Sequence, residues 1–183
     1  MGMQYKKQVL EELSETLEMI SEESKNRLIE YVDSANRIFV YGAGRSGLVM
    51  RAFAMRLMHL GYAVHFIGDV TTPRIVNGDI LLIGSASGEK GMALTLSEKA
   101  KSLGIPVVLI STNYECRIAQ TADLTVKILA PTKRPDNTVV SIQPPGSRFE
   151  QALWLFSDLF VLEILEKKGR TVEFLQERHA NLE

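Results

Sequence analysis

The sequence lacks the cysteine content, the histidine clusters and the excess of positive charge that are typical of disulfide-stapled, metal-binding and nucleic-acid-binding proteins. Its single cysteine, Cys116, excludes an internal disulfide framework and fits a reducing compartment. Its 21 basic and 22 acidic residues leave a net charge of -1, so no global charge attracts a nucleic acid or a membrane surface. Its three histidines form no cluster with metal-ligand spacing. We therefore expect a cytoplasmic protein with no nucleic-acid partner and no metal.

Long hydrophobic runs are also lacking. The most apolar stretch, "ALWLFSDLFVLEIL", is interrupted by Asp158 and Glu163 and is too short to span a bilayer. The N-terminal stretch is acidic and helical in period, without the apolar core of a signal peptide. We expect no membrane partner.

What the sequence does contain is an alternation of short apolar runs and helical periodicity. The runs at 37–42, 63–68, 79–85, 105–111 and 123–129 are typical of buried parallel strands. Helices are predicted at 4–20, 21–35, 46–60, 89–103 and 147–168. The pattern predicts an α/β fold, a three-layer αβα sandwich around a five-stranded, parallel, doubly wound sheet. One domain is expected over 1–183, with N-terminal helices over 4–35, an α/β core over 37–168 and a tail helix over 171–183.

Two glycine-rich loops follow predicted strands. "GAGRSG" (42–47) ends the first strand and "GSASGEKG" (84–91) ends the third, and each leads into a helix whose N-terminus favours an anion. Ser46, Ser85 and Ser87 can donate hydrogen bonds to phosphate oxygens. The first loop also fits the G-x-G-x-x-G turn of a dinucleotide site, with Asp69 as a ribose-binding acid. Ordinary turns and helix caps are a third interpretation.

Four further side chains are candidates with two interpretations each. Glu150 is a possible base, although an acid at a helix N-terminus also simply stabilises the helix. His179, the fifth residue counted back from position 183, fits a surface group or an acid–base residue. His59 fits a substrate contact or a packed or C-capping histidine. Arg45 can reach a substrate or brace the loop through an ion pair, whereas His65 is interpreted as structural.

Two other features of the sequence indicate a functional segment and an oligomer. Residues 129–148 hold four of the six prolines, and an irregular segment of this length in a small domain is typical of function. The helices at 46–60 and 149–165 are apolar nearly all round, so one face of each needs a partner besides the sheet. We expect a homo-oligomer.

The motifs together resemble the sugar isomerase (SIS) domain family. "GAGRSG", "FAMRLMHLG", "GSASGE", "PPGSRFEQ" and "ERHANLE" resemble the corresponding motifs of its 6-phospho-3-hexuloisomerases, over about residue 5 to the end. The resemblance implies a flavodoxin-like SIS fold and interconversion of D-arabino-hex-3-ulose 6-phosphate and D-fructose 6-phosphate through a 2,3-enediol. That reaction belongs to the ribulose monophosphate pathway, serves formaldehyde fixation or pentose supply, and needs no cofactor.

The resemblance also implies roles for residues. Glu150 would be the base and His179 would serve the oxygen protons, from the same chain or in trans from a neighbouring subunit, with a tetramer favoured over a dimer. The expected phosphosugar contacts are Gly44, Arg45, Ser46, Ser85, Ser87, Gly88, Glu89 and His59.

The sequence departs from the family pattern in the second glycine-rich loop and in the motif around Glu150. Ala86 and Lys90 stand where the family has glycine and threonine, and Pro145 and Arg148 occupy positions that are usually apolar. Another SIS phosphosugar isomerase, a non-catalytic sugar-phosphate sensor and the NAD interpretation remain as alternatives.

Overall fold

The five apolar segments form one parallel sheet, as the sequence predicts. The computed structural model describes residues 2–89, 91–131 and 139–182. Its strands pair in the order β2-β1-β3-β4-β5, all in parallel. Their bounds are β1 (Ile38–Gly42), β2 (Val64–Phe66), β3 (Ile80–Gly84), β4 (Val107–Ser111) and β5 (Leu124–Lys127). Every residue of β3 and β4 is buried, as expected of strands covered on both faces.

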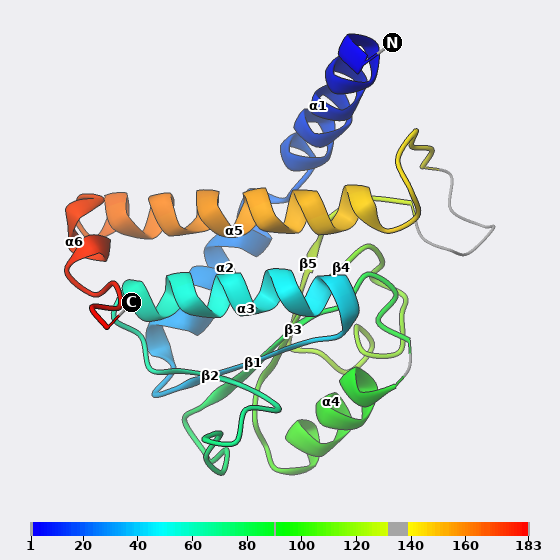
Figure 1. Ribbon diagram of the computed structural model, residues 1–183. Helices are drawn as coiled ribbons and strands as arrows, with labels where there is room; N and C mark the ends of the chain where they lie inside the picture. Colours follow the sequence, from blue (N-terminus) through cyan, green and yellow to red (C-terminus); the bar gives the residue numbers. More distant parts are fainter. Residues whose placement is uncertain (1, 90, 132–138, 183) are drawn as a thin grey trace.

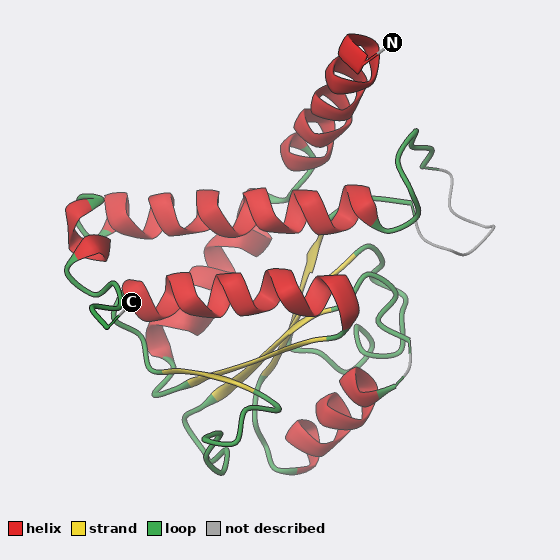
Figure 2. Ribbon diagram, in the orientation of Figure 1, coloured by secondary structure: helices red, strands yellow, loops and turns green. Residues whose placement is uncertain are grey.

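Helices cover the two faces of the sheet unequally (Figures 1 and 2). The helices are α1 (Gly2–Glu18), α2 (Glu22–Ser34), α3 (Gly44–His59), α4 (Met92–Ser102), α5 (Ser147–Lys167) and α6 (Glu173–Gln176). On one face α3 packs on β1 and β2, α2 packs on β5, and α5 lies along α3. On the other face α4 packs on β3 and β4. The expected three-layer αβα sandwich is confirmed.

The alternation of side chains along the strands divides the core into two clusters. Ile38 and Val40 of β1 join the cluster beneath α2, α3 and α5, whereas Phe39 between them joins the cluster beneath α4. This is the period of two that a strand imposes on its side chains. Helix α1 packs on α5 and extends away from the sheet in Figure 1.

The strand order places a topological switch point between β1 and β3. From β1 the chain passes through α3 to the edge strand β2, and then returns to β3 on the other side of β1. In open α/β sheets ligands bind beyond the carboxyl ends of the strands at such a point. Both glycine-rich loops begin there.

The C-terminal tail is less helical than expected. Helix α6 covers only Glu173–Gln176, and the following backbone forms turns in which Arg178 and His179 donate to carbonyls three residues earlier. Leu175 is the one buried residue of α6. A short segment with so little apolar contact does not sustain a regular helix, because most helical stability in proteins comes from packing of an apolar face.

Candidate active site

The two strands at the switch point both end in glycine, and these glycines are paired across the sheet. Gly42 of β1 lies opposite Gly84 of β3 in the strand register. A Cβ on either residue would lie 3.0 Å or less from the side chain of Met50, which comes from α3. The missing side chains therefore allow α3 to lie against the ends of β1 and β3.

The three glycines of "GAGRSG" have different structural roles. A Cβ on Gly47 would lie 2.5 Å from the carbonyl oxygen of Gly42, so the strand–helix contact excludes any side chain there. Gly44 has a φ of +56° and nothing within 4 Å of the position of its Cβ, so its backbone conformation favours glycine and the space beside it is open. Gly44, Arg45 and Ser46 form the first turn of α3, whose N–H groups have no carbonyl within the helix to bond. This turn can bind an anion.

The loop after β3 is held in place by β4. Ala86 accepts hydrogen bonds at its carbonyl from the hydroxyls of Ser111 (3.0 Å) and Thr112 (2.8 Å) and from the Thr112 N–H (3.2 Å). The Ser85 hydroxyl accepts a hydrogen bond from the Gly88 N–H (3.1 Å), which closes the turn. Sequence reasoning missed Ser111 and Thr112, although two hydroxyl residues ending an apolar run were a visible signal.

Gly88 lies where this loop touches the segment after β4. Its φ is +59°, and a Cβ there would lie 2.3 Å from the sulfur of Cys116. Its carbonyl accepts a hydrogen bond from the Ile118 N–H. Cys116 is fully buried beneath the loop, so it packs rather than reacts.

The remaining residues expected in this loop differ in exposure. Ser87 is exposed, whereas Ser85 and Glu89 are half-buried. Lys90, which stands in place of the family's threonine, lies outside the described residues.

Glu150 and Arg45 meet although 105 positions separate them in the sequence. The Arg45 Nε donates a hydrogen bond to the Glu150 carboxylate, and the two side chains form an ion pair. Arg45 comes from the first turn of α3 and Glu150 from the first turn of α5, so the two helix N-termini lie together at the switch point. The Glu150 side chain is only 13% exposed, whereas that of Arg45 is 66% exposed. The ion-pair interpretation of Arg45 is therefore what the structure shows, and its exposed guanidinium remains accessible to a ligand.

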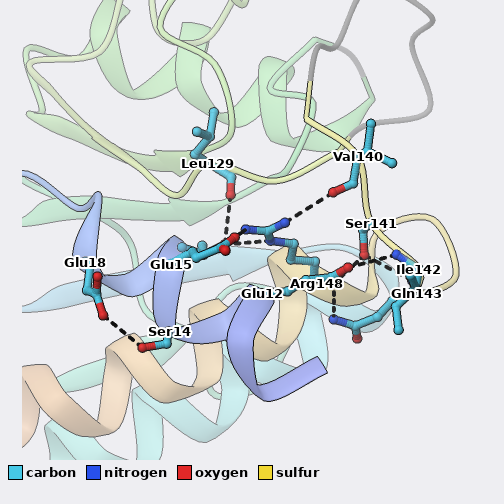
Figure 3. A network of polar contacts seen from close by, with 11 residues as sticks. Glu12, Ser14, Glu15, Glu18, Leu129, Val140, Ser141, Ile142, Gln143 and Arg148 are labelled. Carbon is cyan, nitrogen blue, oxygen red and sulfur yellow. Dashed lines mark hydrogen bonds and ion pairs between the residues drawn. The ribbon is translucent and has the colours of Figure 1, made fainter. Parts of the chain in front are cut away.

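Arg148 anchors the start of α5, and Figure 3 shows its contacts. Its guanidinium is buried and donates to the Thr16 hydroxyl (2.7 Å), the Val140 carbonyl (3.2 Å) and the Glu15 carboxylate (3.3 Å). Thr16 in turn donates to the Leu129 carbonyl. This departure from an apolar family position thus ties α1 and both ends of the proline-rich segment to the helix that carries Glu150.

Helix α1 makes a second contact with the same segment. The Glu12 carboxylate accepts hydrogen bonds from the Ser141 hydroxyl (2.6 Å), the Ile142 N–H (2.8 Å) and the Gln143 amide (2.9 Å). Burial raises the pKa of Glu12, but these hydrogen bonds and the charge of Arg148 outweigh it and hold the pKa below its ordinary value. Residues 132–138, in the middle of the proline-rich segment, lie outside the described residues.

A surface cleft of about 470 Å³ opens beside Arg45 and Glu150. Its other lining residues are mostly apolar and come from α1, α3 and α5: Leu10, Leu13, Leu48, Val49, Gln151, Trp154 and Leu155. Leu48 is 66% exposed and Trp154 47% exposed, so large apolar side chains face solvent here. Such a surface suits a protein partner better than a sugar, which needs many hydrogen-bonding groups.

The two candidate histidines lie together at the other end of α3. The His59 and His179 rings are 5.1 Å apart between centroids, and His59 is the last residue of α3. Because α3 has 16 residues, a rise of about 1.5 Å per residue puts roughly 20 Å between this end and Arg45. Within one chain, therefore, neither histidine joins the cluster around Glu150. The predicted helix over 46–60 already implied this separation for His59, whereas nothing in the sequence indicated where His179 lies.

Asp69, the acid of the dinucleotide interpretation, and His65, interpreted as structural, both have partners. Asp69 accepts a hydrogen bond from Arg51 (2.8 Å), whose guanidinium also lies 3.8 Å from the centre of the Phe66 ring. His65 packs its ring against Phe39, in agreement with its structural interpretation.

Metal sites and membrane-spanning helices are absent from the part of the chain that the structure describes. Residues 2–89, 91–131 and 139–182 contain no group of three or more His, Cys, Asp or Glu side chains placed to hold a metal ion. No helix in these ranges has the length and apolarity needed to cross a bilayer.

Comparison with known proteins identifies the family. Residues 31–154 match the SIS domain. The 3-hexulose-6-phosphate isomerase of Bacillus subtilis (strain 168) is 41% identical over 98% of this chain and 98% of its own length. The enzyme of the same name from Mycobacterium gastri is 39% identical over 96% of this chain and 88% of its own length. A Methanococcus jannaschii protein, whose crystal structure infers 3-hexulose-6-phosphate isomerase function, superposes with a TM-score of 0.81 at 31% identity, covering 95% and 98% of the two chains. The chain belongs to the SIS domain family.

Proposed function

We propose that the chain is an isomerase that interconverts D-arabino-hex-3-ulose 6-phosphate and D-fructose 6-phosphate. The full-length similarity to relatives named 3-hexulose-6-phosphate isomerase supports this substrate. The single observation that carries the chemistry is the position of Glu150, a largely buried carboxylate beside two loops suited to phosphate. The same proposal places the isomerase in the ribulose monophosphate pathway and in the cytoplasm.

The reaction moves one proton between neighbouring carbons. A base takes the proton from C2, and the C3 carbonyl oxygen gains a proton, which gives the 2,3-enediol. The hydroxyl at C2 then loses its proton to become the carbonyl of fructose 6-phosphate, while C3 is protonated. One group must serve the carbons and another the oxygens.

The cluster at the switch point supplies the first of these groups and the phosphate site. Glu150 is the base in this proposal, and Arg45 beside it holds the carboxylate and offers exposed N–H groups to substrate oxygens. The phosphate would bind at the first turn of α3 and at Ser85, Ser87 and Gly88, with Glu89 nearby. Binding at the phosphate, remote from C2, supplies energy that orients the carbons.

The second group requires a second chain. His179 lies roughly 20 Å from Arg45 along α3, so it serves the substrate oxygens only in trans. Helices α3 and α5 run parallel and both begin at the switch point (Figure 1). A two-fold axis perpendicular to them would therefore place one chain's tail beside the other chain's Glu150. The apolar cleft and the exposed Leu155, Leu159 and Leu162 of α5 are the surface such a partner would cover. We propose a homo-oligomer, with a tetramer favoured over a dimer.

The test is conversion of enzymatically prepared hex-3-ulose 6-phosphate to fructose 6-phosphate by the wild type and by Glu150→Gln. We expect the variant to bind substrate with little change and to lose at least about 10²-fold in kcat, because general base catalysis contributes that much. Glu163→Gln is the matched control, since Glu163 lies on the same helix and pairs with Lys25 away from the site. Normal turnover by Glu150→Gln would overturn the assignment of the base.

The wild-type result separates the alternatives. Turnover of a different sugar phosphate would identify another SIS isomerase. A rise in melting temperature with sugar phosphates, without turnover of any, would identify a sensor. A rise with NAD alone would restore the dinucleotide interpretation.

A further inference from the structure

His59 is a buried histidine that no hydrogen bond within the described chain explains. It is 2% exposed, and its Nδ1 has no hydrogen-bond partner among the described residues. A buried polar atom without a partner is costly, so an apolar side chain would fill this place at lower cost. The presence of an imidazole here therefore calls for a reason other than stability.

Capping of α3 is not that reason. The helix ends in a Schellman motif, in which Gly61 donates to the Met58 carbonyl and Tyr62 donates to the Leu57 carbonyl. Gly61 has the positive φ, +96°, that the motif needs. The last carbonyls of α3 are thus bonded by backbone N–H groups, and the His59 side chain is free of that role.

The His59 ring packs against the ring of His179. The two rings are inclined by 31° with their centroids 5.1 Å apart, which is an offset, nearly stacked arrangement. His179 itself is exposed, and its other side-chain contact is a long one, 3.4 Å, to the neighbouring carbonyl of Ala180. The buried ring of His59 is therefore a fixed surface against which the exposed ring of His179 packs.

Burial and the neighbouring cations disfavour the charged form of His59. Burial, His179 and Arg56 of α3 lower the pKa of His59 below its ordinary value. Two more arginines lie on the tail side: Arg170 donates to the Leu60 carbonyl, and Arg178 packs beside Gly61 and over the Phe174 ring. Asp158 of α5 is paired with Arg56.

We propose that His59 is a positioning residue that acts through His179. Its ring holds the His179 imidazole against the end of α3, so that the two histidines form one unit, presented to the site of a neighbouring copy. This inference rests on the proposed function, in which His179 serves the substrate oxygens.

A double-mutant comparison of His59→Ala, His179→Ala and the combined variant tests the coupling. We expect His179→Ala to lower kcat by about 10²-fold or more, as removal of an acid–base group does. His59→Ala should lower kcat by at least about tenfold, with KM within about twofold, because the phosphate contacts that bind the substrate are assigned to the two glycine-rich loops and not to the tail. If His59 acts only through His179, the combined variant should be no worse than His179→Ala alone. A combined loss equal to the product of the single losses would overturn the proposal.

Two further variants separate positioning from general loss of structure. His59→Phe keeps a ring against His179 and removes both nitrogens, so it should restore most of the turnover lost in His59→Ala. A loss in His59→Phe as large as that in His59→Ala would overturn the role of the ring contact. Leu57→Ala is the control, since Leu57 is equally buried two positions earlier on α3. It should lower the melting temperature without the selective loss of kcat.

A spectroscopic measurement decides the inference even if the proposed substrate is wrong. The chain has three histidines, so a protein labelled with ¹³C at the histidine rings gives three assignable signals. The His179 signal should move in His59→Ala and return toward its original position in His59→Phe. An unmoved His179 signal in His59→Ala would overturn the inference, whereas failure of the wild type to convert hex-3-ulose 6-phosphate would overturn only the proposed function.

Discussion

The three glycines of the first loop should respond differently to the same added methyl group. In Gly47→Ala, the new Cβ would lie 2.5 Å from the Gly42 carbonyl oxygen and 2.9 Å from its carbonyl carbon, where ordinary contact begins near 3.4 Å. Both clashing atoms are backbone, so α3 has to move away from β1 by about 1 Å. Overpacking of this kind costs about 1–3 kcal/mol. In a chain of this size that lowers the melting temperature by about 2–12 °C.

Gly44→Ala should instead spare most of the stability and impair substrate binding. Its φ of +56° imposes a penalty of about 1–2 kcal/mol on a residue with a Cβ. Nothing lies within 4 Å of the new methyl group, which would point into the open space where we place the phosphate. We expect KM for the sugar phosphate to rise by at least about tenfold, with a smaller change in kcat, because phosphate contacts orient the substrate.

Gly169→Ala is the matched control for the backbone penalty. Gly169 has nearly the same φ, +59°, nothing within 4 Å of its Cβ position, and a place after the end of α5, far from the loop. Thermal melting and steady-state kinetics of the three variants should give similar stability losses for Gly44→Ala and Gly169→Ala, and a raised KM only for Gly44→Ala. Equal KM values in these two variants would refute the phosphate site, and wild-type stability of Gly47→Ala would refute the packing argument.

Three further predictions concern the supports of the site. Arg148→Met removes a buried guanidinium that makes three hydrogen bonds, so the free energy of unfolding measured in urea should fall by about 2–4 kcal/mol; a change below about 0.5 kcal/mol would contradict the network. Gly88→Ala would set a Cβ 2.3 Å from the Cys116 sulfur, so both the melting temperature and phosphate affinity should fall, and Cys116→Ala in the same chain should recover part of the loss. Because the folded-state pKa of Glu12 is lowered, its contribution to stability is present above the unfolded-state value, about 4.3, and is lost as the pH falls through the folded-state value. Melting temperatures of Glu12→Gln should therefore be lower than wild type at neutral pH and approach it in acid; a constant difference would contradict the assignment.

The sequence predicted the sheet and its loops well because those signals are local. Each strand is a continuous apolar run bounded by turn residues, and the helices are longer segments of helical period between those runs, so their positions follow from short-range patterns. The G-x-G-x-x-G spacing predicted a strand–turn–helix, and the structure has one. The spacing alone did not separate a phosphate site from a dinucleotide site, because both use the same backbone geometry.

The tail was predicted less well because its signal is weak. The sequence suggested a helix over 171–183, but α6 covers Glu173–Gln176. Helical spacing in a short segment is a weak predictor of a helix when only one of its side chains, Leu175, is buried. Ser111 and Thr112 were missed for a different reason: their role is to hold a loop that follows another strand, which no pattern within their own segment records.

The sequence by itself determined the alternation of strands and helices, the two glycine-rich turns and the candidate residue types. Only the tertiary structure decided which of these candidates meet. It joined Arg45 to Glu150 across 105 positions, since the order β2-β1-β3-β4-β5 brings the starts of α3 and α5 to one edge of the sheet. It also brought His179 against His59, which lies at the end of α3 far from Arg45. These distances depend on how the helices and strands pack on one another. Packing results from many weak contacts between segments that lie far apart in the sequence, so residue spacing does not reveal it.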